Sequence, residues 1–236
     1  MRVVTTCHKA GLDQYGTRWL DGRKNWPRKT EFWLYTEGYP LEAPGLTVKD
    51  VGDIPGFAEW KAKHIHYRPP GWQWDVVKFA NKVFAICDAL SDYDGIGVWL
   101  DADVVTHRKI PKGVIEKAVQ GHYVAHYGRT GLYTETGMWV VDCSHPAHKA
   151  FLDTMRQSYL NERYQVLSQW HDCMVFDATL RSFVKAGRVT ARNLSGQFHK
   201  DMHPMAKTEF AKYLDHCKGN RKKAGYSPEN EYRAVA

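Results

Sequence analysis

Short apolar runs and longer amphipathic stretches follow one another along the chain. Apolar runs of strand length cover residues 2–6 and 31–36, with a helix capped at Asp13 expected between them. The stretch from about 74 to 90 has a helical period, and its apolar residues recur every third or fourth position: Phe79, Val83, Ile86 and Leu90. Strand, helix and strand at this spacing predict a βαβ unit and a parallel sheet.

The second half of the chain continues this alternation. Its predicted elements are helices near 111–120, after Pro146 and after Asp172, and strands at 122–126, 136–142 and 189–194. Residues 41–75 are rich in proline, glycine and aromatic residues, which predicts an irregular segment, and within it residues 64–72 are expected to form an ordered active-site loop or a mobile lid. We therefore expect one α/β domain over residues 1–236, with a mostly parallel central sheet flanked by helices.

Two aspartates follow a short apolar run in the middle of the chain. The run from Gly95 to Leu100 reads as a buried strand, and Asp101 and Asp103 come directly after it. In open α/β sheets ligands bind at the carboxyl ends of the strands, where a turn can aim both carboxylates at one hard divalent cation. The alternative is a solvated, aspartate-rich turn without a ligand.

Composition narrows the class of protein. The chain has 236 residues, of which 43% are hydrophobic, and this is enough for one sizeable core. The formal net charge of +7 favours a polyanionic partner or phosphorylated substrates, although a soluble protein can also be basic without either. Five scattered cysteines without a Cys-x-x-Cys pair indicate a reducing compartment. With no signal-peptide pattern and no membrane-length apolar stretch, we expect a cytoplasmic protein.

A second candidate site stands near the C-terminus. His216, Gly219 and Lys222 are spaced by three residues each. An imidazole can complete the coordination of a Mn²⁺-like ion, a glycine lets backbone approach an anion, and a lysine neutralises leaving-group charge. The alternative is a basic, frayed C-terminus.

Together, these two patterns resemble the glycosyltransferases of the GT-A fold, which carry an Asp-x-Asp in mid-chain and a C-terminal histidine. The His-x-x-Gly-x-x-Lys spacing from His216 to Lys222 resembles that of the glycogenin and lipopolysaccharide galactosyltransferase family, whose pattern ends in Pro-Trp where Lys223-Ala224 stands here. The resemblance implies a nucleotide-sugar donor, expected to be a UDP-sugar, and Mn²⁺ or Mg²⁺ as cofactor.

The same resemblance assigns roles to residues. It implies that Asp101, Asp103 and His216 bind the metal, that Gly219 and Lys222 bind the diphosphate, and that Thr5 and Thr6 lie beside the nucleobase. Ala102 stands between the aspartates, and Lys78 and Lys82 are one turn apart on the preceding helix, where they are expected to face the donor or, alternatively, solvent. Residues from about 203 to 236 follow the last predicted core helix and mix histidine, glycine, lysine and arginine, so we expect them to close over the donor.

Two further segments resemble the acceptor side of this fold. Glu135-Thr136-Gly137 precedes a predicted strand, and His171-Asp172 stands at a helix start. Glu135 and Asp172 are therefore the candidate catalytic carboxylates, with Asp172 placed to take a proton from an acceptor hydroxyl. The alternative for Asp172 is a helix N-cap.

Other readings use the same residues. Residues 100–105 also resemble the first motif of haloacid-dehalogenase phosphatases, in which Asp101 would be the nucleophile. A non-enzymatic nucleic-acid-binding module is the other alternative, and it rests on the net charge and on a basic cluster, namely Lys207, Lys212, Lys218, Arg221, Lys222 and Lys223.

The acceptor is inferred from general features only. The chain resembles small phage glycosyltransferases, some of which modify hydroxymethylated pyrimidines in DNA, and a small sugar, a lipid-linked glycan or a protein hydroxyl are alternatives. Residues expected to contact DNA phosphates or to fill the gap left by a flipped base are His8, Lys9, Arg68, Arg129 and Lys200, and Tyr67, Trp72 and Tyr133.

Overall fold

One seven-stranded sheet organises the computed structural model, which describes residues 1–67, 69–195 and 203–233. In spatial order its strands are β3 (Thr47–Asp50), β2 (Glu31–Thr36), β1 (Arg2–Cys7), β4 (Ile96–Leu100), β7 (Glu135–Asp142), β6 (Val124–Tyr127) and β8 (Ala191–Asn193). Parallel pairing joins β3, β2, β1 and β4, and also β6 to β8, whereas β7 runs antiparallel to both of its neighbours. The sheet is thus mostly parallel, which confirms the predicted fold class.

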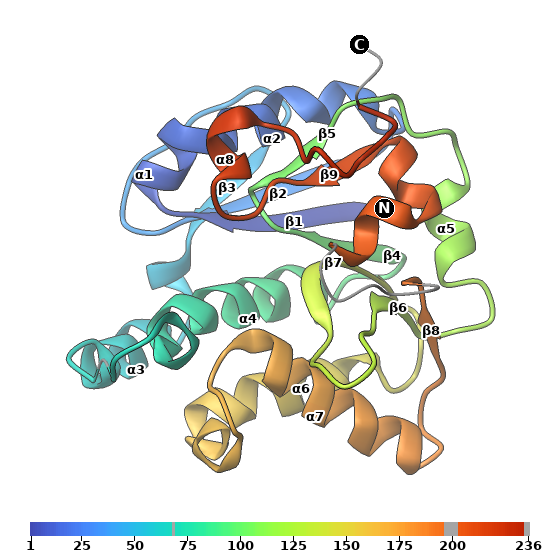
Figure 1. Ribbon diagram of the computed structural model, residues 1–236. Helices are drawn as coiled ribbons and strands as arrows, with labels where there is room; N and C mark the ends of the chain where they lie inside the picture. Colours follow the sequence, from blue (N-terminus) through green and yellow to red (C-terminus); the bar gives the residue numbers. More distant parts are fainter. Residues whose placement is uncertain (68, 196–202, 234–236) are drawn as a thin grey trace.

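Side chains that alternate along the strands divide the core into two layers. Val4 and Trp99 point to a layer made with α4 (Val76–Leu90), α6 (His148–Leu160) and α7 (Asp172–Lys185), which lie together on one face of the sheet (Figure 1). Val3 and Val98 point to the opposite layer. There the sheet is covered by α2 (Thr17–Gly22), α5 (Val114–Ala118) and the C-terminal segment.

The interval 41–75 is more regular than its composition predicted. It contains strand β3 and helix α3 (Phe57–His64), so the prediction of an irregular loop was wrong for these residues. The aromatic rings of Phe57 and Trp60 are buried and pack on Phe84 of α4, with ring centroids 4.7 and 6.1 Å away. These two aromatic residues of the interval are therefore core residues.

The first helical segment starts earlier than predicted. Helix α1 (Lys9–Gly11) is followed without a break by a π-helical turn (Leu12–Gly16) and by α2. Its N-cap is His8, whose Nδ1 accepts the N–H of Gly11 at 3.0 Å, while Asp13 pairs with Lys9 on the surface. The expectation that Asp13 caps this helix was therefore wrong.

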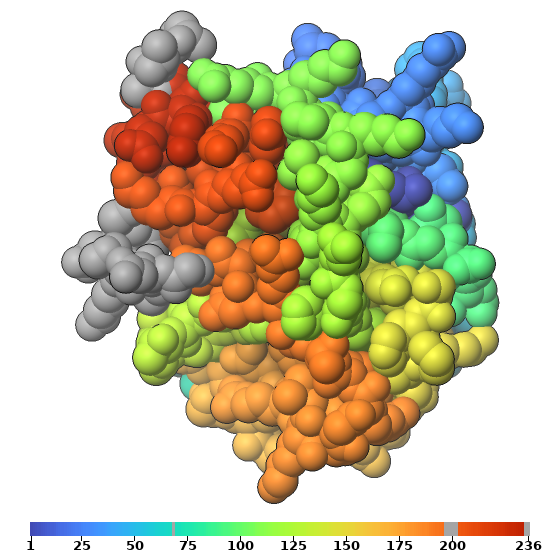
Figure 2. Space-filling model, turned by 90° about the vertical axis from the view of Figure 1, so that its right-hand side faces the viewer, coloured from blue at the N-terminus to red at the C-terminus, as the bar shows by residue number. Residues whose placement is uncertain are grey.

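The C-terminal segment is packed against the domain. Strand β9 (Leu214–His216) forms a two-stranded antiparallel ribbon with β5 (Val104–Thr106), and α8 (Arg221–Ala224) follows it. Figure 2 shows this orange-to-red segment lying along the green segment that contains β5. Leu214 is fully buried, so the described part of the segment is not frayed. Its closure over a bound nucleotide stays a prediction.

Within the described ranges, no helix has both the length and the apolar character needed to cross a bilayer.

Candidate functional site

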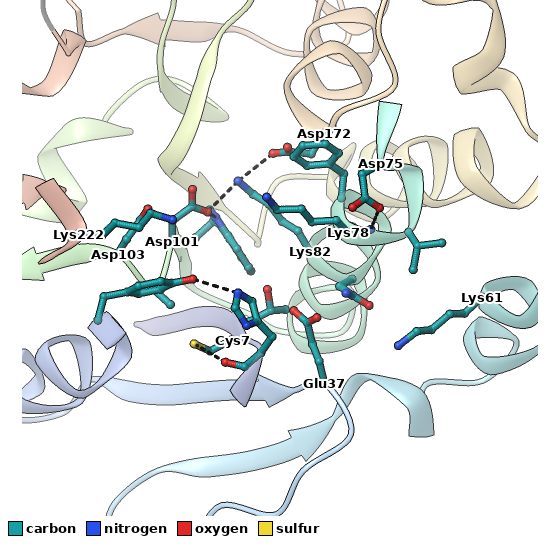
Figure 3. A pocket seen from close by; sticks show the side chains of 18 of the residues that line it. Cys7, Glu37, Lys61, Asp75, Lys78, Lys82, Asp101, Asp103, Asp172 and Lys222 are labelled. Carbon is teal, nitrogen blue, oxygen red and sulfur yellow. Dashed lines mark hydrogen bonds and ion pairs between the residues drawn. The ribbon is translucent and has the colours of Figure 1, made fainter. Parts of the chain in front are cut away.

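A cavity of about 520 Å³ opens at the carboxyl ends of β1, β2 and β4 (Figure 3). Parallel strands bring these ends to one edge of the sheet. The lining includes the strand ends (Thr6, Cys7, His8, Glu37, Asp101, Ala102, Asp103), the start of α4 (Asp75, Lys78, Asn81, Lys82), the start of α7 (Asp172), α8 (Lys222), the π-helical turn (Tyr15) and α3 (Lys61).

Asp101 is fixed by the strand that precedes it. Its backbone N–H donates to the carbonyl of Gly137 on β7 at 2.8 Å. Its Oδ1 accepts from the indole N–H of Trp99 at 2.6 Å and from Lys82 Nζ at 3.0 Å. The chain then turns, since the N–H of Val104 donates back to the carbonyl of Asp101. The second carboxylate oxygen of Asp101 is left facing His216 and Asp103.

The pairing of β5 with β9 brings His216 to the two aspartates. Val104 is the register partner of His216, and the N–H of Cys217 donates to the carbonyl of Asp103 at 3.0 Å. His216 Nε2 lies 3.1 Å from Asp103 Oδ1 and 3.9 Å from Asp101 Oδ2. The three predicted metal ligands are therefore assembled, with one ligand atom of each within 4.8 Å of the others.

The donor set of this cluster fits a divalent cation. His216 Nε2 and Asp103 Oδ1 are buried and lie within ion-pair distance of each other, and neither atom makes a well-aligned hydrogen bond with any other described residue. Burial alone would raise the pKa of Asp103, but His216 and Lys222 hold it below its usual range, so the group is a carboxylate. Two carboxylates and an imidazole suit Mn²⁺ or Mg²⁺ and leave positions open for phosphate oxygens.

Two other groupings of possible ligands are poorer metal sites. Glu135, His203 and His216 form one, and His171, Asp172 and Cys173 form the other. In each group the carboxylate is already in contact with a lysine ammonium, since Lys218 Nζ is 2.6 Å from Glu135 and Lys82 Nζ is 2.8 Å from Asp172. Lysines also contact Asp101 and Asp103, but that cluster has two carboxylates, each with its second oxygen facing His216, whereas each of these groups has a single carboxylate to offset the charge of a cation.

Lys222 returns to the cluster through a tight turn. Its Nζ lies 2.9 Å from Asp103 Oδ2, and its carbonyl accepts from the guanidinium of Arg18. Gly219 does not line the cavity, but it has a left-handed φ of 60°, which favours glycine. Gly219 thus belongs to the turn after β9, and this turn brings Lys222 back to Asp103.

Lys82 is the most enclosed charge at the site. Its side chain is 8% exposed, and its Nζ lies 3.0 Å from Asp101, 2.8 Å from Asp172 and 2.6 Å from the carbonyl of Thr136. Burial would lower the pKa of Lys82, but the two carboxylates raise it above its ordinary value. The lysine is therefore protonated and links the two acidic elements of the site. Lys78, one turn earlier, lines the same cavity and is exposed.

Asp172 begins α7 but does not cap it. The N-cap position belongs to His171, which makes no side-chain capping bond, so the N-cap interpretation of Asp172 was wrong. Asp172 Oδ2 accepts from Thr136 Oγ1 at 2.5 Å and faces Lys82. Burial would raise the pKa of Asp172, but Lys82 and Thr136 lower it. A carboxylate with a lowered pKa accepts a proton less readily than an ordinary one.

Glu135 lies behind His216 and does not line the cavity. It is 2% exposed, its Oε2 contacts Lys218, and its Oε1 is 3.9 Å from His216 Nδ1. Gly137, two residues later, is the glycine on which His216 packs, since a Cβ at Gly137 would lie 2.0 Å from His216 Cε1. The sequence pattern singled out Glu135-Thr136-Gly137 as a candidate segment. It gave no signal that this segment contacts His216.

Some expected donor contacts are present and others are not. Thr6 and Ala102 line the cavity, whereas Thr5 is fully buried and does not. The sequence reasoning missed Asn81 and Glu37, although both line the cavity. Asn81 lies two residues from both Phe79 and Val83, off the predicted apolar face of α4, so the helical period gave no signal for it, whereas the end of a buried strand was the signal for Glu37.

Comparisons with known proteins identify the fold. No family model and no curated protein matches the chain. An active-site mutant of the galactosyltransferase LgtC superposes with a TM-score of 0.54 and 11% identity, over 84% of this chain and 74% of that one. Mouse xyloside xylosyltransferase 1 in its apo form gives a TM-score of 0.52 and 10% identity, over 82% of this chain and 84% of that one. The chain therefore has the GT-A fold of these glycosyltransferases.

Proposed function

We propose that the protein is a metal-dependent glycosyltransferase, which moves a sugar from a nucleotide-sugar donor to a hydroxyl acceptor. The observation that carries this proposal is the convergence of Asp101, Asp103 and His216 within 4.8 Å beside a cavity at the carboxyl end of the sheet. The fold shared with LgtC and xyloside xylosyltransferase supports it. A UDP-sugar is the donor to test first.

The proposed ligands of the metal are Asp101, Asp103 and His216, with Mn²⁺ or Mg²⁺ as the ion. When bound, such an ion neutralises the charge of the leaving nucleoside diphosphate. Lys222 contacts Asp103 on the cavity side and is placed to bind the same diphosphate. We propose Glu135 as a positioning residue that acts through His216, because it lies 3.9 Å from the far nitrogen of that ring.

Lys82 and Asp172 mark the side of the cavity where the transferred sugar would lie. Lys82 holds a positive charge between Asp101 and Asp172 (Figure 3). In that place it orients both carboxylates, and its three N–H groups are used by Asp101, Asp172 and the carbonyl of Thr136. We propose that Asp172 contributes mainly the negative charge that keeps Lys82 protonated and in place, since its own pKa is lowered.

The nucleic-acid-binding alternative receives less support from the basic cluster than the sequence suggested. Four of its members face carboxylates, namely Lys207 with Glu231, Lys218 with Glu135, Arg221 with Glu229 and Lys222 with Asp103. These charges are largely compensated within the chain. No observation favours the phosphatase alternative over the glycosyltransferase.

The proposed acceptor remains a hydroxymethylated pyrimidine in DNA. Tyr67 and Trp72 are 53% and 59% exposed and so are available to a base, as this acceptor requires. Among the basic candidates, Lys9 pairs with Asp13, and Arg129 is engaged by the carbonyl of Tyr133. Arg68 and Lys200 lie outside the described residues.

The metal assignment predicts the behaviour of an Asp103→Asn variant. Nucleotide-sugar hydrolysis and transfer should fall about a hundredfold or more, because an amide removes a charged ligand at the site of leaving-group stabilisation. The circular dichroism spectrum should be unchanged. EDTA should reproduce the loss in the wild-type protein, and Mn²⁺ or Mg²⁺ should reverse it. Full activity in the presence of EDTA would rule out the metal assignment.

The link between Lys82 and Asp172 predicts a pH-dependent stability. The folded pKa of Asp172 is lowered, so its carboxylate stabilises the fold above the usual aspartate pKa, and this contribution is lost as pH falls through the lowered value. Asp172→Asn should reduce the free energy of unfolding by about 1–3 kcal/mol at neutral pH and by less near pH ~3. Urea titrations at both pH values measure this. The exposed Asp53→Asn, which breaks no ion pair within the described chain, is the control, and an equal loss in Asp172→Asn at both pH values would contradict the account.

The DNA acceptor predicts a mass shift. Hydroxymethylcytosine- or hydroxymethyluracil-containing DNA, incubated with the protein, Mn²⁺ and a panel of nucleotide sugars, should yield nucleosides heavier by one sugar residue. Binding to this DNA should weaken by orders of magnitude from ~50 to ~200 mM salt if several phosphates are contacted. Transfer to a small saccharide without transfer to DNA would refute the acceptor and leave the glycosyltransferase proposal standing.

A further inference from the structure

Two hydrogen-bond acceptors line the cavity outside the metal cluster. Glu37 follows β2, its side chain points into the cavity, and its carboxylate makes no hydrogen bond or ion pair with any described residue (Figure 3). Asn81 of α4 is 2% exposed, and its Oδ1 is a buried acceptor without a donor in the described chain. A buried unpaired acceptor such as the Asn81 Oδ1 costs free energy unless a ligand supplies an N–H or O–H group, and the half-buried carboxylate of Glu37 is open to the same ligand.

No neighbouring cation in the described part of the chain forms an ion pair with the carboxylate of Glu37. Burial raises the pKa of Glu37 to about 7, although Lys61 and Lys78 act in the opposite direction. Neither lysine approaches closely enough to form an ion pair. A ligand N–H directed at this carboxylate would therefore favour its charged form and supply the missing partner.

The sheet fixes the distance from Glu37 to the metal cluster. The order β2-β1-β4 places two strand spacings, roughly 10 Å, between the ends of β2 and β4. The register of β1 with β2 pairs Cys7 with Thr36, so Glu37 emerges beside His8 at the same edge. A diphosphate held at Asp103 would thus continue as ribose over the end of β1 and as base at the end of β2. This step rests on the proposed function.

The Watson–Crick edges of the bases differ at one ring nitrogen. Uracil, thymine and guanine carry a ring N–H there, flanked by a carbonyl group. Cytosine and adenine carry a bare nitrogen lone pair at the same position. A carboxylate accepts a hydrogen bond from the first group and is repelled by the lone pair of the second, and proteins read this edge by hydrogen bonds.

We propose that Glu37 selects the donor nucleotide by its base, accepting the ring N–H of uracil, thymine or guanine and excluding cytosine and adenine. Lys61 and Lys78 lie on the same side of the cavity, where ammonium groups suit the carbonyl oxygens that flank this N–H. Asn81 takes a second donor from the nucleoside. Glu37 would separate uracil and thymine from cytosine among the pyrimidines, and guanine from adenine among the purines. It would not by itself decide between a pyrimidine and a purine.

Isothermal titration calorimetry of the full chain with Mn²⁺ and UDP, CDP, GDP or ADP tests this at about pH 8, above the raised pKa of Glu37, where the group is a carboxylate and cannot donate to a lone pair. Within a size class that binds, the wild-type protein should prefer UDP to CDP, or GDP to ADP, by about tenfold or more, since a hydrogen bond to a charged group is gained in one case only. Glu37→Gln should reduce this preference to about threefold or less, because an amide can also donate to a lone pair. Glu42→Gln removes an exposed charge nearby and should leave the preference unchanged.

The possible outcomes separate the two proposals. Equal affinities for UDP and CDP, or for GDP and ADP, in the wild-type protein would overturn the role of Glu37 while leaving nucleotide binding intact. A preference that persists in Glu37→Gln would also overturn it. If none of the four nucleotides binds in the presence of Mn²⁺, the proposed function itself fails, and the inference fails with it.

Discussion

The ammonium group of Lys82 is held between Asp101 and Asp172, in the interior of the protein. A buried charge is stable only when opposite charges and hydrogen bonds surround it. This requirement ties four elements together, since Lys82 comes from α4, Asp101 follows β4, Thr136 belongs to β7 and Asp172 begins α7. The helix that precedes the aspartates is thus held in register with the strand that presents them.

The other half of the site depends on a contact between distant parts of the chain. β9 pairs with β5 and brings His216 to Asp103, and the turn at Gly219 then returns Lys222 to the same carboxylate. His216 also needs the absence of a side chain at Gly137, on which its ring packs. The cluster of Asp101, Asp103 and His216 therefore forms only when the C-terminal segment is folded onto the sheet.

Local patterns in the sequence predicted much of this arrangement. The period of α4, the apolar run before Asp101 and the alternation of strands and helices were sufficient for the fold class, because each is set by residues close in sequence. The strands β3 and β9 were missed, since each is short and is stabilised by pairing with a strand elsewhere in the chain. The cap at Asp13 was wrong because His8 supplies the acceptor one turn earlier.

Some residues of the site were also predicted from local patterns, and others were not. Asp101, Asp103 and His216 carried recognisable spacings, and the structure brings them together. The places of Glu135 behind His216 and of Asp172 beside Lys82 depend on the packing of β7 and α7, which no local pattern encodes. Glu37 carried no motif, because its position in the cavity follows from the order of the strands.

The central claim is that Asp101, Asp103 and His216 hold one divalent metal ion. Its most direct test is a titration of the protein with Mn²⁺, in the presence of UDP, followed by electron paramagnetic resonance. The account predicts one bound ion per chain, with affinity weakened at least about tenfold in His216→Ala and unchanged in the exposed His66→Ala. Binding of equal strength in the wild-type protein and in His216→Ala, or no binding to the wild-type protein, would contradict it.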